Sequence, residues 1–160
     1  MPTYELFRVK DSNSNGFLNM VKIINNRILS KAGESGYSLY GIFFGLFGLA
    51  TNELYLIAMK EDSNPPVAGT TPLSELLSKH NLIIQENFQF SPTVRPIEHT
   101  RRTRAGIYVF RWFTIYNRDV DQIVKLSDEA WVTFEGGFES EVQGLFAERD
   151  RGKEEGKMLR

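Results

Sequence analysis

The chain has 160 residues, 41% hydrophobic and 24% charged, which is typical of one globular domain or two small, tightly joined halves. A net charge of −1 excludes the strong basic field that nucleic-acid-binding proteins usually carry. The lack of cysteine excludes disulfides and thiolate nucleophiles, and it fits a cytoplasmic protein.

Residues 1–92 predict the element order β-α-β-β-α-β, which is that of a ferredoxin-like half. The N-terminus leads straight into a strand and lacks the pattern of a signal peptide. The expected strands are residues 4–10, 37–48, 53–60 and 82–90. One helix carries an apolar stripe of Phe17, Met20, Val21, Ile24 and Ile28, and the other begins at Thr71-Pro72, a cap followed by proline.

The uncharged stretch of residues 39–50 contains Gly41 and Gly45 at the spacing of a membrane-helix contact motif. A membrane-spanning helix needs about 20 apolar residues, and Asn52 and Glu53 follow this shorter stretch at once. The stretch therefore predicts a buried strand and no membrane span. The alternative is a membrane protein that uses it as a span, and that alternative fails if the chain stays in solution without detergent.

Residues 91–105 break the pattern with two prolines and four arginines, at positions 95, 101, 102 and 104. This composition predicts a crossover between two halves. The expected domains are residues 1–92 for the first half, 93–105 for the linker and 106–160 for the second half. The arginine cluster at 101–104 either lies in solvent or contacts a phosphate or an acidic partner.

Residues 106–135 predict a strand followed by a helix, and they repeat the beginning of the chain at an offset of 103. The offset carries Phe7-Arg8 onto Phe110-Arg111 and the first helical stripe onto Val120, Ile123, Val124, Ser127 and Trp131. It also carries Gly41-Ile42-Phe43 onto Gly144-Leu145-Phe146. A constant register across three elements predicts tandem ferredoxin-like halves, and hence an α+β fold.

The same offset places the counterpart of residues 53–90 at 156–193, beyond Arg160. The second half is therefore expected to be incomplete, with an unpaired sheet edge and an uncovered face. Either the chain is a shortened version of a longer protein or a second copy covers the gap. A homodimer is the partner that this pattern predicts.

The strand 107–113, the helix 119–135 and Gln143-Gly144-Leu145-Phe146 resemble the NIPSNAP family. The resemblance is strongest over residues 106–148. It implies the dimeric α+β barrel superfamily, in which two ferredoxin-like sheets close face to face into a barrel. It implies no defined activity, because NIPSNAP-like proteins mostly lack an assigned one, while the wider superfamily includes cofactor-free monooxygenases, isomerases and haem proteins.

Arg111 is the strongest candidate for a ligand-binding residue, because strand alternation places its charge among apolar residues of a strand covered on both sides. It would bind a carboxylate or another anion inside the barrel, or it would form an internal ion pair with Glu5 or Glu148. Arg8 is its counterpart in the first half. Aromatic side chains would line a pocket for an apolar ligand or simply form core, and the candidates are Tyr108, Trp112, Tyr116, Phe43 and Phe47.

No constellation of acid, base and nucleophile stands out, and neither His80 nor His99 has the spacing of a metal site. The sequence therefore predicts no metal and no cofactor. The expected function is that of a NIPSNAP-like binding or self-associating α+β barrel protein. The alternative is a cofactor-independent enzyme, of monooxygenase or isomerase type, that acts on a small apolar or anionic ligand in the barrel interior.

Overall fold

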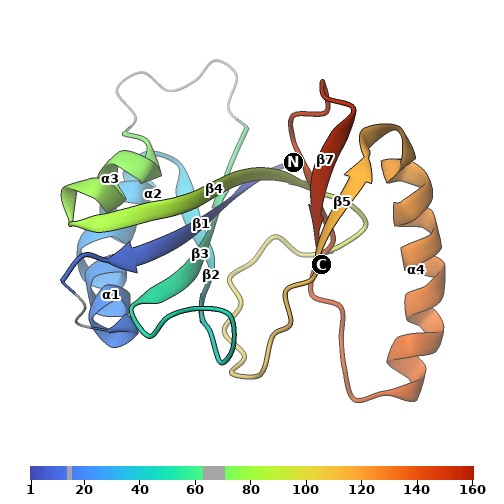
Figure 1. The fold of residues 1–160 in the computed structure, drawn as a ribbon, viewed down its shortest axis with the longest axis horizontal. Helices are drawn as coiled ribbons and strands as arrows, with labels where there is room; N and C mark the ends of the chain where they lie inside the picture. The colour runs from blue at the N-terminus through green and yellow to red at the C-terminus, as the bar shows by residue number, and fades with distance from the viewer. Residues whose placement is uncertain (14–15, 63–70) are drawn as a thin grey trace. The chain divides into compact units, whose positions relative to one another are not determined.

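The computed structural model describes residues 1–13, 16–62 and 71–160, and it has a mixed α+β fold (Figure 1). The described strands form an antiparallel sheet in the order β2-β3-β1-β4-β6-β7-β5. The chain divides into two compact units. Unit 1 holds residues 1–88 and 100–103, and unit 2 holds residues 89–99 and 104–160.

Unit 1 has the element order that the sequence predicts for the first half. Its elements are β1 (Thr3–Asp11), α1 (Phe17–Ile23), the π-helical turn η1 (Ile24–Ile28), α2 (Leu29–Glu34), β2 (Tyr37–Phe44), β3 (Glu53–Lys60), α3 (Leu73–Lys79) and the first part of β4 (Leu82–Pro92). The predicted first helix is thus one α-π-α run, because η1 inserts a wider turn into it.

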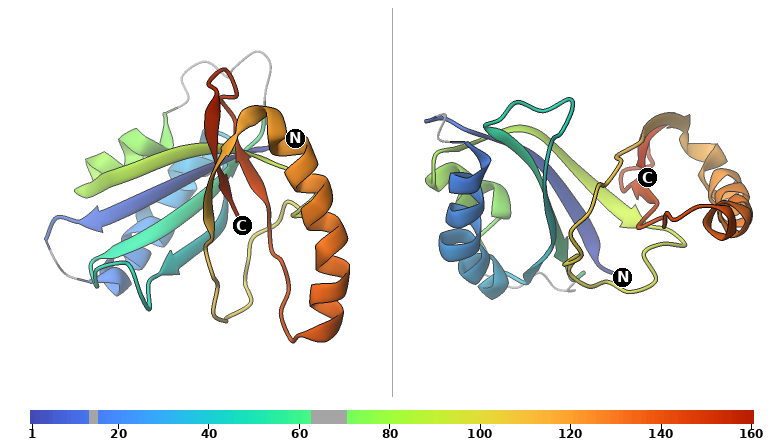
Figure 2. Two further views of the ribbon diagram at one scale, coloured as in Figure 1. Left: turned by 45° about the vertical axis from the view of Figure 1, so that its right-hand side comes forward. Right: turned by 90° about the horizontal axis from the view of Figure 1, so that it is seen from below.

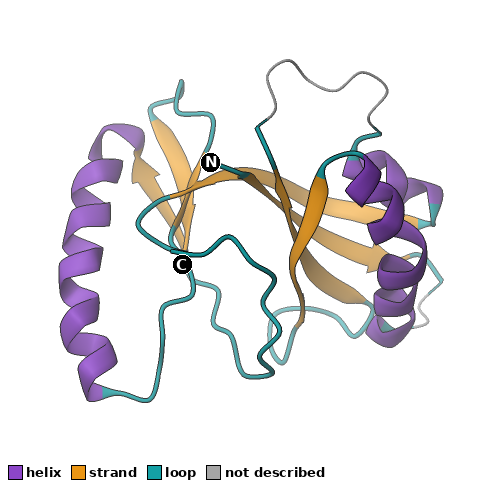
Figure 3. Cartoon of the chain, turned by 180° about the vertical axis from the view of Figure 1, so that it is seen from behind, coloured by secondary structure: helices purple, strands orange, loops and turns teal. Residues whose placement is uncertain are grey.

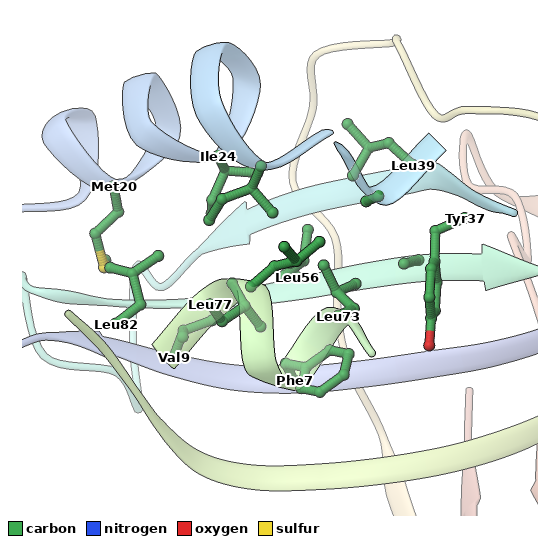
Figure 4. Close-up of a cluster of buried hydrophobic side chains, with 14 of the residues drawn as sticks. Phe7, Val9, Met20, Ile24, Tyr37, Leu39, Leu56, Leu73, Leu77 and Leu82 are labelled. Atoms are coloured by element: carbon green, nitrogen blue, oxygen red, sulfur yellow. The ribbon is translucent and has the colours of Figure 1, made fainter. Parts of the chain in front are cut away.

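The core of unit 1 lies between its helices and one face of its sheet (Figures 2 and 4). The predicted stripe supplies Met20, Ile24 and Ile28, which are fully buried. Alternate residues of the strands complete the core, including Phe7 in β1 and Leu56 in β3. Burying a side chain of this size contributes about 1.5–3 kcal/mol, so this layer dominates the stability of unit 1.

The strand residues between these core positions point to the other side, which we call the second sheet face of unit 1, and Tyr4, Leu6 and Ile57 on this face are also buried. Register places Arg8 of β1 opposite Tyr55 of β3, and Tyr55 opposite Phe43 of β2. A bulge between Leu39 and Gly41 keeps β2 in this register. The second sheet face therefore carries a row of three side chains, and two of them, Arg8 and Phe43, are candidate site residues predicted from the sequence.

Unit 2 contains the end of β4 and the second strand-helix-strand-strand series (Figure 3). Its elements are β5 (Trp112–Tyr116), the 3-10 turn η2 (Asn117–Asp119), α4 (Val120–Gly137), β6 (Phe146–Glu148) and β7 (Glu155–Leu159). The core packs α4 against the strands, and its largest side chain is Trp131. The predicted second stripe therefore faces this core, and its residue Ser127 is half-buried.

Two predicted strands are shorter in the structure. The strand expected over residues 37–48 ends at Phe44, and Gly45–Ala50 form a loop because the chain turns back to β3. The strand expected from residue 106 begins only at Trp112. Just before it, Arg111 exchanges two backbone hydrogen bonds with Arg160, which lies beside β7. No helix among the described residues is long and apolar enough to cross a membrane.

The division between the units falls within β4, between Phe88 and Gln89, whereas the sequence places the end of the first half at residue 92. The expected linker, residues 93–105, contributes to both units. Within unit 1, Arg102 donates its backbone N–H to the carbonyl of Tyr40. Within unit 2, Thr93 donates to the carbonyl of Leu145. These hydrogen bonds hold parts of the expected linker against the unit to which each part belongs.

Candidate functional site

Arg8 is the centre of an ion-pair cluster on the second sheet face of unit 1. Its Nη2 lies 2.8 Å from Glu53 Oε2, and its Nη1 lies 3.5 Å from Glu86 Oε1. Neighbouring strands hold the three groups together, since Glu53 begins β3 and Glu86 lies in β4. The ion-pair interpretation of Arg8 is thus favoured over the anion anchor, because two carboxylates already surround the guanidinium.

The cluster is held tightly at its Glu53 end. The side chain of Glu53 is 7% exposed and that of Arg8 is 27% exposed. The hydrogen bond from Arg8 and the backbone N–H of Ala50 hold the pKa of the Glu53 carboxyl below its usual range, although burial opposes them. The hydrogen bond to Glu53 raises the pKa of Arg8. With two carboxylates and one guanidinium, the cluster carries a net negative charge and favours a cation over an anion.

Phe43 lies two positions across the sheet from Arg8, with Tyr55 between them. The ring of Phe43 folds back over Gly41, so that a Cβ at residue 41 would overlap the ring. Tyr55 is half-buried, and burial raises the pKa of its hydroxyl. The sequence predicted Arg8 and Phe43 separately, and the structure brings them into one row. Tyr55 was not predicted. It follows the core residue Leu54, and nothing in the local sequence indicates that it lies between Arg8 and Phe43.

The other three predicted site residues, Tyr108, Arg111 and Trp112, belong to unit 2. The predicted burial of Arg111 is wrong, since the residue precedes β5 and its side chain is exposed. Tyr108 donates its hydroxyl to the carbonyl of Arg104 at 2.7 Å. Trp112 begins β5, and its ring centroid lies 6.0 Å from the ring centroid of Phe90. Trp112 thus belongs to an aromatic cluster of unit 2, and Phe90 lies 6.4 Å from Phe146 in that cluster.

A second arginine ion pair in unit 2 was not anticipated. Arg95 holds Glu135 by two hydrogen bonds of 2.7 and 2.9 Å, and it also donates to the carbonyl of Val142. The N–H of Val142 donates to the same carboxylate at 2.8 Å. These bonds hold the pKa of Glu135 below its usual range. The arrangement closes the loop after α4, so its role is structural, and no spacing in the sequence relates residues 95 and 135.

Glu5, Tyr37 and Lys60 form a further polar cluster within unit 1. The hydroxyl of Tyr37 lies 3.3 and 3.4 Å from the carboxylate oxygens of Glu5, and Lys60 Nζ lies 3.5 Å from that hydroxyl. Burial raises the pKa of Glu5, against the opposing effects of Lys60 and the Tyr37 hydrogen bond. The raised pKa keeps the Glu5 carboxyl protonated to a higher pH than is usual for glutamate. Its position among core residues favours a structural role.

One edge of β5 forms backbone hydrogen bonds with β7, and the opposite edge faces away from β7. Arg111 and Arg160 exchange two backbone hydrogen bonds, of 2.7 and 2.9 Å. In an antiparallel ladder such hydrogen-bonded pairs alternate with non-hydrogen-bonded pairs. The pairs of Thr114 with Lys157 and of Tyr116 with Glu155 therefore direct the N–H and C=O groups of Thr114 and Tyr116 away from β7. β5 is also the last strand in the sheet order.

A shallow hollow of about 380 Å³ lies beside η2 and the turn before β7. It is lined by Asn117, Arg118, Arg151, Lys153 and Glu154. Its cations are well solvated, and acids stand beside each of them, such as Asp121 at 3.7 Å from Arg151. Among the residues that the structure describes, no group of three or more histidine, aspartate or glutamate side chains is arranged to hold a metal ion.

Comparison with known proteins identifies no relative, since no family model, curated protein or solved structure matches the chain.

Proposed function

We propose that the chain is a NIPSNAP-like binding protein of the dimeric α+β barrel type that associates with a second copy of itself. The observation that carries the proposal is the outward backbone edge of β5. An edge of this kind is a template for pairing with another strand. The side chains beside it are apolar and exposed, namely Ile107, Val109, Phe113 and Tyr116.

Strand order supports two ferredoxin-like halves. In unit 1 the order β2-β3-β1-β4 and the element order β-α-β-β-α-β are those of a ferredoxin-like unit. In unit 2 the strand-helix-strand-strand series gives the order β6-β7-β5, which corresponds to β2-β3-β1. Local detail agrees with the offset of 103, because the ring of Phe146 folds over Gly144 as the ring of Phe43 folds over Gly41.

The correspondence also suggests what covers the edge of β5. In unit 1, β1 has neighbours on both sides, with β3 on one and β4 on the other. Its counterpart β5 has β7 on one side, and no described strand follows on the other. A strand from a second copy would take the place that β4 takes beside β1. Pairing of β5 with β5 of the second copy is antiparallel and self-complementary, as a two-fold dimer requires.

A test of this proposal uses the full chain and substitutes proline for Thr114. The N–H that proline removes is one that points away from β7, so the β5–β7 ladder keeps its hydrogen bonds. We expect the wild-type chain to have the mass of a dimer in size-exclusion chromatography with light scattering. Thr114→Pro should shift the dimer toward monomer, with a dissociation constant at least about tenfold higher, which corresponds to roughly 1.4 kcal/mol.

The matched control is Thr114→Val, which keeps the N–H and removes only the hydroxyl that accepts a 2.7 Å hydrogen bond from Lys157. It should remain a dimer. Circular dichroism and thermal unfolding of a dilute monomeric sample would establish that both variants are folded. A wild-type chain that stays monomeric at high concentration, or a folded Thr114→Pro variant with unchanged mass, would contradict the proposal.

A further inference from the structure

The loop between β2 and β3 presents a group of exposed apolar side chains, which we call the apolar tip: Phe44, Leu46 and Phe47. Their exposed fractions are 54%, 66% and 94%. They come from the stretch of residues 39–50, whose first part is the half-buried end of β2. Isolated exposed apolar residues are common, but Leu46 and Phe47 are adjacent in one hairpin loop and both are largely exposed.

The base of the tip is fixed by contacts within unit 1. The ring of Phe44 stacks on Phe17 of α1, with 4.3 Å between centroids and 14° between planes. The N–H of Phe17 donates to the carbonyl of Thr51 at 3.1 Å. Gly48 adopts φ +84°, a conformation that disfavours other residues, so the turn has a defined shape. The loop therefore holds Leu46 and Phe47 out toward solvent, and their exposure follows from this geometry.

Basic residues outnumber acidic residues on the helical run beside the tip. The α1–α2 run carries exposed Lys22, Arg27 and Lys31, and its one acidic residue is the exposed Glu34 at the C-terminal end of α2. Residues 37–52 have no charge at all. The acids that flank the loop, Asp11 and Glu53, are buried and hydrogen-bonded. Exposed apolar residues beside a predominantly basic helical run are the pattern of interfacial membrane binding.

We propose that the apolar tip inserts into the interface of an anionic lipid bilayer while the α1–α2 run contacts the headgroups. A protein partner fits less well, because a stable interface buries about 800 Å² on each side, whereas the tip offers only two fully projecting side chains. A lipid interface accepts such a small convex feature and adds attraction for Lys22, Arg27 and Lys31. This docking surface lies in unit 1 and does not depend on the β5 edge.

The test is sedimentation of the full chain with vesicles of phosphatidylcholine alone or with about one third phosphatidylserine, at physiological salt. We expect clear binding to the anionic vesicles and weak binding to the neutral ones. The double variant Leu46→Ser/Phe47→Ser should bind anionic vesicles about tenfold or more weakly, because two large apolar side chains no longer transfer from water. Lys22→Gln/Arg27→Gln should remove most of the preference for the anionic lipid.

Val132→Ser is the matched control, because Val132 is a similarly exposed apolar residue on α4. It should bind vesicles as the wild-type chain does. The chain has no cysteine, so a single cysteine at Ala50 or at Val132 can carry an environment-sensitive fluorophore. Emission should shift to shorter wavelength with anionic vesicles for the label at 50 and stay constant for the label at 132.

Three results would overturn the proposal. The first is a wild-type chain that binds neither kind of vesicle. The second is a folded Leu46→Ser/Phe47→Ser variant that binds as the wild type does. The third is a tip variant that changes the mass of the chain in light scattering but not its vesicle binding, because the tip would then contact a second copy. Thr114→Pro should leave vesicle binding intact, so failure of this proposal is distinguishable from failure of the β5 pairing.

Discussion

The dipeptide Phe-Arg occurs at residues 7–8 and 110–111, and its two copies are placed very differently. Arg8 lies in β1, between β3 and β4, where Glu53 and Glu86 hold its guanidinium. Arg111 lies just before β5, the last strand in the order, and its side chain is exposed. In unit 2 an arginine held by two hydrogen bonds to a carboxylate is Arg95, which belongs to the expected linker.

The comparison shows that neighbouring strands decide whether a charged residue on a strand is enclosed. A strand with partners on both sides brings carboxylates to its arginine and shields them from water. A strand at the edge of a sheet leaves its arginine hydrated, where an ion pair would contribute little. The same local sequence therefore yields a structural ion pair in one unit and a solvated side chain in the other.

The largest expected difference in stability is between substitutions in the two helical stripes. Ile24 is fully buried in unit 1, and Ser127 is half-buried at the corresponding place in unit 2. Ile24→Ala should lower the free energy of unfolding by about 2–5 kcal/mol, because it removes three buried carbons and leaves a cavity. Ser127→Ala should change it by less than about 1 kcal/mol. Urea unfolding measures both, and equal losses would show that the stripes are equally packed.

The next effect concerns the two copies of the dipeptide. Glu53→Ala should cost about 2–3 kcal/mol, because it leaves the partly buried guanidinium of Arg8 with only the more distant Glu86. Arg111→Ala should cost less than about 0.5 kcal/mol. Thermal unfolding at pH 7 compares the two variants. A destabilising Arg111→Ala variant would mean that the second arginine is as enclosed as the first.

The same ion pairs predict the behaviour at acid pH. The pKa values of Glu53 and Glu135 are lowered in the folded state. Their contribution to stability is therefore present above the unfolded carboxyl pKa of about 4.3 and is lost as pH falls through the folded values. The penalty of Glu53→Ala should shrink between pH 6 and pH 3. A penalty that does not change with pH would indicate that packing, and not the charge, makes the contribution.

Glu5 should give a smaller effect of opposite sign, because its pKa is raised by burial. A raised folded pKa contributes stability below the unfolded value and loses it as pH rises through the folded value. Glu5→Gln, which keeps an oxygen for the Tyr37 hydroxyl, should thus raise stability at pH 7, with no gain near pH 4. Unfolding at both values measures this. A loss of stability at pH 7 would show that attraction to Lys60 outweighs burial.

The smallest expected difference in stability is between substitutions of two arginines that lie over tyrosine rings. Arg102 lies 5.2 Å from the Tyr40 ring centre and donates Nε to the Tyr40 hydroxyl at 3.1 Å. Arg118 lies over the exposed Tyr116 at 4.8 Å. Replacing Arg102 by alanine should cost about 1 kcal/mol, and replacing Arg118 less than about 0.5 kcal/mol. Thermal unfolding compares them, and a larger cost for Arg118 would reverse the assignment.

Much of the fold could be predicted because its signals are local. The stripe from Phe17 to Ile28 and the alternation in residues 53–60 each depend on neighbours within a few positions, and both elements are present. The extent of β5 could not be predicted in this way. Residues 107–116 alternate like a strand throughout, but β5 begins only at Trp112, and its pairing with β7 depends on residues 155–159, which are distant in the chain.

The candidate site was predicted only in part. Arg8 and Phe43 were recognised as unusual residues, yet Glu53, Tyr55 and Glu86 join Arg8 only through strand register. The same is true of Arg95 and Glu135, which lie 40 residues apart in the chain. Register and loop closure are long-range properties, and no pattern within a short window carries them.

The sequence by itself determined the α+β class, the helical stripes and the element order of the first half, since hydrophobic periodicity and turn residues act over a few residues. Only the tertiary structure decided which charges are enclosed, that the 39–50 stretch divides into a strand and an exposed tip, and that Arg111 stands outside the core. The physical reason is that burial and ion pairing depend on which strands become neighbours, and that choice is made by the whole chain.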